Sequence, residues 1–228
     1  MAIIANTVQT YLDYISDLRG EGSTISTDDR IRAISRAGND FSRRMLFEFY
    51  LQLNQTLTGD GTTQDFQIGT TALPCRERGL DELFVGDLTE GSRYEIIDYN
   101  AYKLRYNKDN SDRICYQWYD ATNDVWKMHI NPIPASGKTI YYSYFFQQPD
   151  VSSTSDIVYC PDQTIIAKLA LADIYHAEDE LEKETQQKQE AEDLINEVIG
   201  IDNMPNKNEL NSVHPIEANI KKPGLGNY

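Results

Sequence analysis

The spacing of apolar residues changes twice along this chain, and each change limits which elements can form. Near the start, apolar residues recur at i, i+3, i+4, i+7 and i+10, which is the spacing of one helical face. Thr7 is placed to cap this helix and Gly20 to end it. The apolar residues are Val8, Tyr11, Leu12, Ile15 and Leu18.

A second helix is predicted from Thr27 to about Leu53. Asp28 and Asp29 follow Thr27, and acids suit the positive end of a helix dipole. Apolar residues then recur on one face, at Ile31, Ile34, Phe41, Met45 and Phe49.

The helical period stops at Asn54, and residues typical of strands follow. Residues 57–68 are predicted to form a β-hairpin around the turn Gly59-Asp60-Gly61. Turn residues separate the further β-prone segments, which are 81–85, 93–98, 101–106, 113–119, 125–130 and 139–146. This number of short strands predicts a β-sandwich or a small barrel.

Helical spacing returns at Asp162, just after Pro161, and apolar residues continue to Leu181. Between Glu182 and Glu190 no residue is apolar, and the apolar positions resume at Ala191. This gap indicates either the exposed middle of one helix or a break between two. Beyond Gly200, prolines and asparagines without periodicity predict an extended arm.

The chain is therefore predicted to be an α+β protein. Two N-terminal helices and a long C-terminal helix would form a helical bundle with an inserted β-sandwich or barrel-like domain. The predicted parts are N-terminal helices at 1–53, a β domain at 54–156, an acidic helical region at 157–200 that packs on the N-terminal helices, and the arm at 201–228.

Composition excludes several classes of protein. With 228 residues and 40% hydrophobic content, the chain can bury its own core. Its three cysteines are widely spaced without a C-x-x-C, which favours reduced thiols. The first residues lack a basic and apolar export signal, and no run of eighteen apolar residues predicts a membrane span. A net charge of -15 argues against wrapping nucleic acid.

The motifs of common enzymes are absent, including G-x-S-x-G, the P-loop, G-x-G-x-x-G and H-E-x-x-H. Asp173, His176 and Glu180 share a helical face at i, i+3 and i+7, the spacing at which three side chains can hold a metal. However, ten acids stand against two lysines between 173 and 197, so a carboxylate near His176 is expected by chance. We therefore predict no enzyme, no cofactor and no metal.

Two charged sets are candidates for contact with other molecules. The acidic run includes Glu180, Glu182, Glu184 and Glu190, and it is either a solvated helix face or the lining of a channel that repels DNA phosphates. Arg32, Arg36 and Arg43 lie opposite the apolar stripe of the second helix. They would either pair with the acidic surface of a neighbouring copy, form pairs within the chain or stay solvated.

Aromatic residues concentrate in the predicted β domain. Ten of the fifteen tyrosines and both tryptophans fall between residues 94 and 159. Aromatic residues favour strands, so most are expected in the sheet core and in cross-strand pairs. A sugar-binding platform and a protein interface are the alternatives.

The order of these features resembles the head-to-tail adaptor, or connector, proteins of tailed bacteriophages, which form a ring beneath the portal. The similar features are the paired N-terminal helices, the turn at 58–63, the strand that ends at 129–134, the tyrosine-rich strand after it, and the helix opened by Pro161-Asp162 with the stretch 175–180. Together they cover about residues 7–200.

The resemblance implies a homo-dodecameric ring in the neck of the virion, assembled in the cytoplasm of the bacterial host. Its partners would be the portal protein and a tail or second connector protein, and DNA would pass through its channel without specific binding. Extended arms of such rings contact the portal. Here that role would fall to the C-terminal arm, with Ile216, Ile220, Lys221, Lys222, Leu225 and Tyr228.

Two other functions are compatible with the sequence. The first is a tail or baseplate structural protein that binds host glycans through the aromatic β domain. The second is a metal-dependent hydrolase built on Asp173, His176 and Glu180. Exposed aromatic residues on one loop face would favour glycan binding, whereas buried aromatic residues with an exposed acidic helix would favour the connector.

Overall fold

The computed structural model describes residues 4–19, 25–44, 50–106 and 111–202. Within these ranges the chain is a mixed α+β protein, as predicted. Its five α-helices are α1 (Val8–Arg19), α2 (Thr27–Arg44), α3 (Tyr99–Tyr106), α4 (Gln163–Ala177) and α5 (Leu181–Asp202). Its strands are β1 (Ile4–Thr7), β2 (Leu51–Thr58), β3 (Asp65–Gln67), β4 (Cys75–Val85), β5 (Glu95–Ile96), β6 (Ile114–Asp120), β7 (Val125–Asn131), β8 (Thr139–Phe146) and β9 (Ile157–Cys160).

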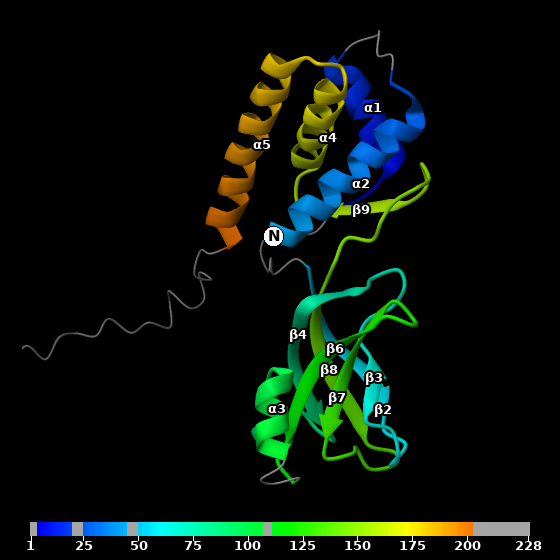
Figure 1. Cartoon of the computed structure of the whole chain (residues 1–228), viewed down its shortest axis with the longest axis vertical. Coiled ribbons are helices and arrows are strands. Elements are labelled where there is room, and N and C mark those ends of the chain that lie inside the picture. The colour runs from blue at the N-terminus through cyan, green and yellow to red at the C-terminus, as the bar shows by residue number, and fades with distance from the viewer. Residues whose placement is uncertain (1–3, 20–24, 45–49, 107–110, 203–228) are drawn as a thin grey trace, which may run out of the picture.

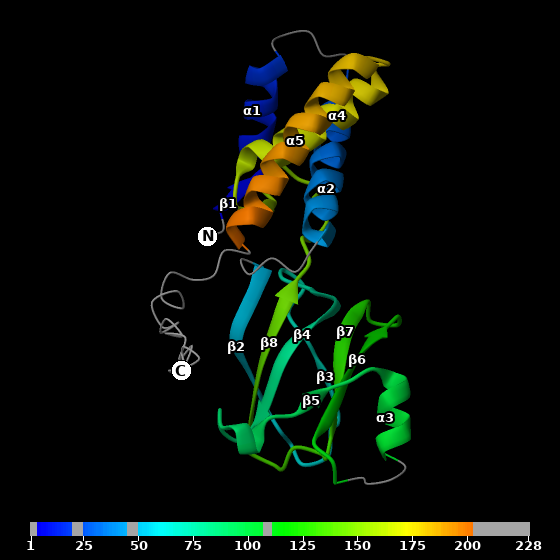
Figure 2. The same cartoon turned by 90° about the vertical axis from the view of Figure 1, so that its left-hand side faces the viewer.

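The elements gather at two ends of an elongated molecule. Helices α1, α2, α4 and α5 lie at one end with β1 and β9, and the remaining strands lie at the other end with α3 (Figures 1 and 2). One connected core of buried side chains extends from the helices into the sheets. No helix in the described ranges is both long and apolar enough to cross a bilayer.

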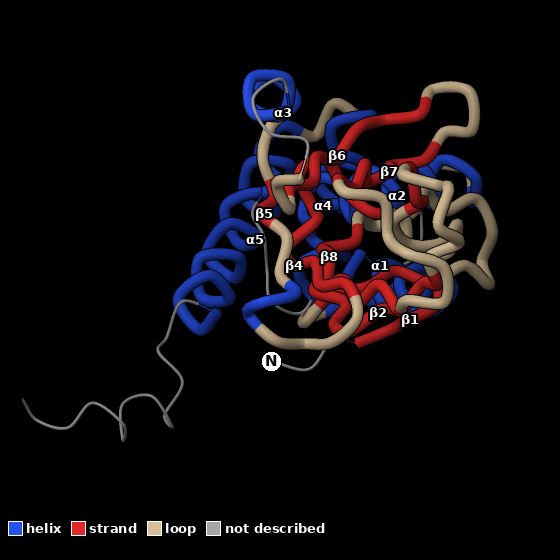
Figure 3. The backbone as a smooth tube through the Cα atoms, turned by 90° about the horizontal axis from the view of Figure 1, so that it is seen from below, coloured by secondary structure: helices blue, strands red, loops and turns tan. Residues whose placement is uncertain are grey.

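The strands form three sheets. In the order of hydrogen-bonded neighbours they are β1-β9, β2-β8-β4 and β3-β7-β6-β5. The two larger sheets lie opposite each other when the molecule is seen from below (Figure 3). On one side, the backbone N–H of Tyr94 donates to the carbonyl of Leu83 at 2.9 Å and links the sheets.

The helix beginning at Val8 is confirmed, and Val8, Tyr11, Leu12 and Ile15 are its buried residues. The second helix begins at Thr27 as predicted, but its extension to Leu53 is wrong. Helix α2 ends at Arg44, and Leu51 already pairs with Phe145 of β8. Pairing with a strand almost 100 residues later overrides the apolar period, because that pairing satisfies backbone groups in a shared sheet.

The predicted hairpin at 57–68 is also wrong. Strand β2 pairs with β8, whereas β3 pairs with β7 in the other sheet. The turn between them packs on a second turn, since the N–H of Gly59 donates to the carbonyl of Lys138 at 2.8 Å and the N–H of Gly137 to that of Gly59 at 2.9 Å. The segment therefore crosses between sheets.

Residues 101–106, predicted as a strand, belong to helix α3. Asp98 caps this helix, because its Oδ1 accepts from the backbone N–H groups of Asn100 and Ala101 at 2.8 and 2.9 Å. The alternation of aromatic and polar residues in this segment favoured a strand, so the sequence prediction did not use the capping residue Asp98.

The predicted long C-terminal helix is two helices. The helix begins next to Asp162, as predicted, and Asp162 caps α4 by accepting from the N–H of Thr164 at 2.8 Å. The chain then turns at 178–180, where Asp179 has φ of 58°. The stretch without apolar residues, 182–190, lies inside α5, so the break precedes it and the stretch itself stays helical.

Candidate interaction surfaces

A seam of ion pairs joins α2 to the two C-terminal helices. The Nε of Arg36 lies 2.8 Å from Oδ2 of Asp173 on α4. Arg44 makes two hydrogen bonds to Glu192 on α5, at 2.6 and 2.7 Å, and pairs with Asp40 on its own helix at 2.8 Å. The sequence shows the Asp40 and Arg44 spacing, but only the fold brings Glu192 to Arg44.

The three arginines predicted to meet a neighbouring copy differ in their surroundings. Arg32 pairs with Asp29 on the same helix at 3.1 Å, and Arg36 pairs with Asp173. Arg43 is exposed, and within the described ranges its side chain forms no ion pair. Contact with a neighbour stays a prediction for all three, and Arg43 is the most available for it.

The acidic residues predicted on the surface separate into exposed and structural groups. Glu182 is exposed, and Glu180 is half-buried beside Lys183. Glu190 pairs with Lys168 on α4, and the hydrogen bond from this lysine lowers the pKa of the Glu190 carboxyl. Asp193 and Glu197, which the prediction did not name, add to the exposed acidic face of α5.

For Glu184 the expected exposure is wrong. This side chain is buried, because Lys188 donates to one carboxylate oxygen and Nδ1 of His176 lies 3.0 Å from the other. The hydrogen bonds from Lys188 and then His176 lower the pKa of Glu184. Glu184 therefore stabilises the α4–α5 packing and is not part of an open acidic surface.

The spacing of Asp173, His176 and Glu180 does not produce a metal site. Each is held by a different partner, respectively Arg36, Glu184 and Lys183. Among the described residues, no three histidine, cysteine or acidic side chains come together in a way that could hold a metal ion. The three cysteines are free thiols, and all are buried.

Most aromatic side chains of the β end are buried or half-buried, as expected. Of those between 94 and 159 that the structure describes, Tyr99 and Tyr119 are the large exposed ones, at 49% and 46%.

A polar network that the sequence did not indicate holds α3 on its sheet. His129 Nδ1 lies 2.8 Å from Oδ1 of Asp65, and its Nε2 lies 3.1 Å from the hydroxyl of the buried Tyr102.

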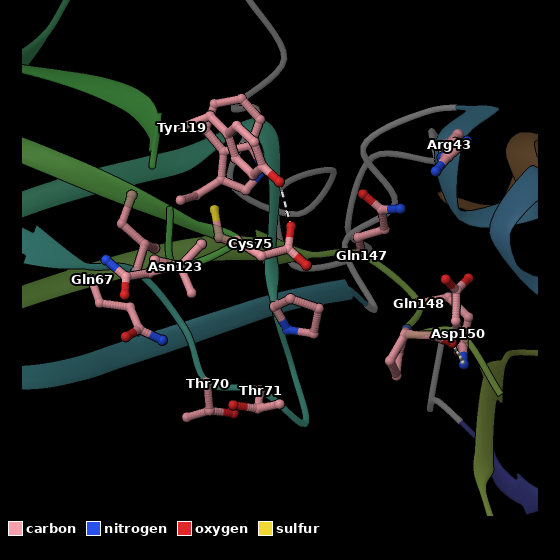
Figure 4. Close-up of a pocket in the computed structure, with 16 residues that line it drawn as sticks. Arg43, Gln67, Thr70, Thr71, Cys75, Tyr119, Asn123, Gln147, Gln148 and Asp150 are labelled. Atoms are coloured by element: carbon pink, nitrogen blue, oxygen red, sulfur yellow. Dashed lines mark hydrogen bonds between the residues drawn. The ribbon is translucent and has the colours of Figure 1, made fainter. Parts of the chain in front are cut away.

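A cavity of about 620 Å³ lies where the helical end meets the strands (Figure 4). Its wall includes Tyr119, whose ring lies 5.2 Å from that of Trp126, and whose hydroxyl donates to the Asp124 carboxylate. That hydrogen bond raises the pKa of Tyr119. Arg43 and Asp150 lie across the cavity from Tyr119 (Figure 4). The arrangement combines aromatic surface, charge and amide groups, which is the chemistry of a site for a polar ligand.

The predicted arm residues Ile216, Ile220, Lys221, Lys222, Leu225 and Tyr228 lie outside the described residues. Their role stays a prediction.

A comparison with protein-family models found no family that matches the chain, and a search of curated proteins found no match either. The resemblance to phage adaptors therefore depends on the order of features along the chain alone.

Proposed function

We propose that this chain is the subunit of a head-to-tail adaptor ring in the neck of a tailed bacteriophage. The ring would join the portal protein to the tail or to a second connector ring, and it would form part of the channel through which DNA passes. In this role the chain carries out no chemistry. Twelve copies would close the ring, and each arm would add a contact outside the main interface, which increases avidity.

The observation that carries the proposal is the separation of the two ends. Strands β2 to β8 form an end of their own with α3, while the helices before and after them pack together at the other end. The resemblance implies a helical bundle with an inserted β domain, and this separation supports that proposal. A protein that spans between two partners needs such separate surfaces.

The distribution of charge and aromatic residues also supports the proposal. Glu182, Asp193 and Glu197 are exposed on α5, which packs on α4 along one side. Negative charge on a channel wall would repel phosphates, so that a DNA duplex passes without being held. The burial of most tyrosines in the β end argues for a structural role of that end rather than a broad sugar-binding platform.

Mass photometry of the purified protein, alone and mixed with its cognate portal, tests the proposal. We expect a ring-sized species with the portal, and we expect its loss when the chain is truncated after Gly200. An Arg43→Glu variant should weaken the ring more than Arg32→Glu, because Arg32 already has a partner on its own helix. If the full-length chain stays monomeric in every mixture, the adaptor proposal is wrong.

Glycan binding by a tail or baseplate protein is the second candidate, and one observation favours it. The cavity at the junction exposes Tyr119 beside Asp124, and sugars bind where aromatic faces stand next to polar groups. A glycan array with the purified protein tests this function. Binding that Tyr119→Ala abolishes and Tyr99→Ala retains would support it.

A further inference from the structure

The cavity at the junction carries two carboxylates whose hydrogen-bond partners are neutral. Asp124 accepts from the hydroxyl of Tyr119, and Asp150 accepts from Nδ2 of Asn39 at 2.5 Å. Across the part of the chain that the structure describes, neither carboxylate forms an ion pair with a lysine or arginine. Arg43 is the one cationic side chain among the described residues of the wall. A ligand that carries mainly positive charge suits this cavity.

The aromatic part of the wall adds a second requirement. Tyr119 is 46% exposed, and its ring lies 5.2 Å from that of Trp126. Aromatic faces attract both apolar groups and cations. The cavity therefore suits a peptide in which lysines stand next to apolar side chains, and its volume of about 620 Å³ accommodates a few such side chains.

The chain itself contains such a segment. Residues 203–228 hold three lysines and two acids, while the rest of the chain holds 18 lysines and arginines against 34 acids. By side-chain charge this segment is net positive by one, and it is attached to a body that is net negative by 16. Within it, Lys221 and Lys222 follow Ile220 and precede Leu225 and Tyr228.

The end of α5 places this segment within reach. The pair between Arg44 and Glu192 holds α5 beside the end of α2, where Arg43 lines the cavity. Both helices end at the level where the helices meet the strands (Figures 1 and 2). Helix α5 continues from Glu192 to Asp202, or about 15 Å at 1.5 Å per residue. The stretch from there to Lys221 can span at most about 60 Å when extended.

We propose that the segment Ile216–Tyr228 docks into this cavity on its own chain, with Lys221 and Lys222 beside Asp124 and Asp150. Tethering favours the same chain over another copy, because a covalent connection of this length gives an effective concentration near the millimolar range. The inference does not depend on ring formation. In an adaptor ring, a partner that binds the arm would have to displace it from the cavity.

The two tryptophan indole signals in an NMR spectrum of the full-length protein test the proposal. Trp126 lines the cavity, whereas Trp118 donates to Asp65 elsewhere and reports on the fold. We expect Lys221→Glu with Lys222→Glu to shift the Trp126 signal and leave that of Trp118 in place. Lys207→Glu, a charge reversal nearer to α5, should leave both signals unchanged.

A free peptide of residues 214–228, added to the Lys221→Glu, Lys222→Glu protein, should return the Trp126 signal toward its original position. Asp124→Asn combined with Asp150→Asn should remove this response, and Glu182→Gln should retain it. A Trp126 signal that is the same with and without the two lysines would overturn the proposal. A Trp126 signal that depends on protein concentration would also overturn it, because this indicates docking between copies. A Trp126 signal that moves with a neutral oligosaccharide instead of the peptide would overturn it as well. No portal is present, so none of these outcomes bears on ring formation.

Discussion

The carboxamide of Gln148 hydrogen-bonds to β9 at Tyr159 in the way that a neighbouring strand would. Its Oε1 accepts from the backbone N–H of Tyr159 at 2.8 Å, and its Nε2 donates to the carbonyl of Ile157 at 3.0 Å. Gln148 is 1% exposed. It lies two residues after the end of β8, so this side chain fixes the helical end to the strand end on the side of β9 that β1 does not cover.

Replacing Gln148 should therefore be costly. We expect Gln148→Ala to lower the free energy of unfolding by roughly 2 to 4 kcal/mol, since each buried polar group left without a partner costs about 1 to 3 kcal/mol. Gln147→Ala is the matched control, because its neighbouring side chain is only half-buried. Urea denaturation measures both, and equal losses would contradict the assigned role of Gln148.

Gly69 is the second position where a small change should have a large effect. Its φ is +76°, and a Cβ there would lie 2.6 Å from the carbonyl oxygen of Leu73. Gly137 has φ of +77°, but a Cβ would meet nothing within 4 Å.

In both alanine variants the substituted residue must adopt the left-handed conformation, which lowers stability by about 1 to 2 kcal/mol. Only Gly69→Ala also adds a clash with the backbone, so it should destabilise by at least about 1 kcal/mol more than Gly137→Ala. Thermal unfolding of the two variants compares them directly. A Gly137→Ala variant that is the less stable of the two would refute this explanation.

Asp120 should make stability depend on pH. Hydrogen bonds from Lys127 and then Asn123 lower the pKa of its carboxyl to about 2. An unfolded aspartate has a pKa of about 3.9, so the folded state holds the charged form more tightly. The resulting stabilisation is present above pH 3.9 and is lost as the pH falls toward 2.

The urea midpoint of Asp120→Asn should accordingly lie below that of the original protein at pH 6, and the two should converge near pH 2. Lys127→Met should remove the same pH-dependent stabilisation. Combining it with Asp120→Asn should lower the urea midpoint little further. A constant difference across the whole range would show that the pair does not titrate as described.

The pair between Arg44 and Glu192 should couple α2 to α5. Exposed ion pairs contribute about 0.2 to 1 kcal/mol, and the short contacts of Arg44 Nη1 with both carboxylate oxygens of Glu192 place this pair near the upper limit. A double-mutant cycle with Arg44→Met and Glu192→Gln should give a coupling of about 0.5 to 1 kcal/mol that weakens at high salt. The same cycle on Arg32 and Asp29 is the control, and it should give less because both side chains are more exposed.

Local signals in the sequence were sufficient for several elements. The apolar spacing from Val8 and the cap at Asp162 both mark helices that the structure contains. The β-prone segments at 113–119, 125–130 and 139–146 became β6, β7 and β8. The sequence also contains a capping residue for α3, Asp98, but the tyrosines after it favoured the prediction of a strand. For these helices and for the β6–β7 pair the deciding interaction is local, whereas β8 pairs with β2 and β4, which lie far from it in the sequence.

The candidate surfaces were less predictable. The sequence located the acidic run and the basic stripe, but it did not distinguish the exposed Glu182 from the buried Glu184, nor the paired Arg36 from the exposed Arg43. Those differences arise from partners on other helices. The cavity itself combines residues from α2, β7 and the segment after β8, which no spacing along the chain reveals.

By itself, then, the sequence determined the helices that begin at Val8, at Thr27 and next to Asp162, the strands β6 to β8, the large negative charge and the charge of residues 203–228. Tertiary structure decided that Leu51 enters a sheet instead of extending a helix, that residues 57–68 cross between sheets, and that Gln148 holds β9. The physical reason is distance along the chain. Backbone pairing of Leu51 with Phe145, and the ion pair of Arg44 with Glu192, join groups roughly 100 or more residues apart, and only the folded chain brings them together.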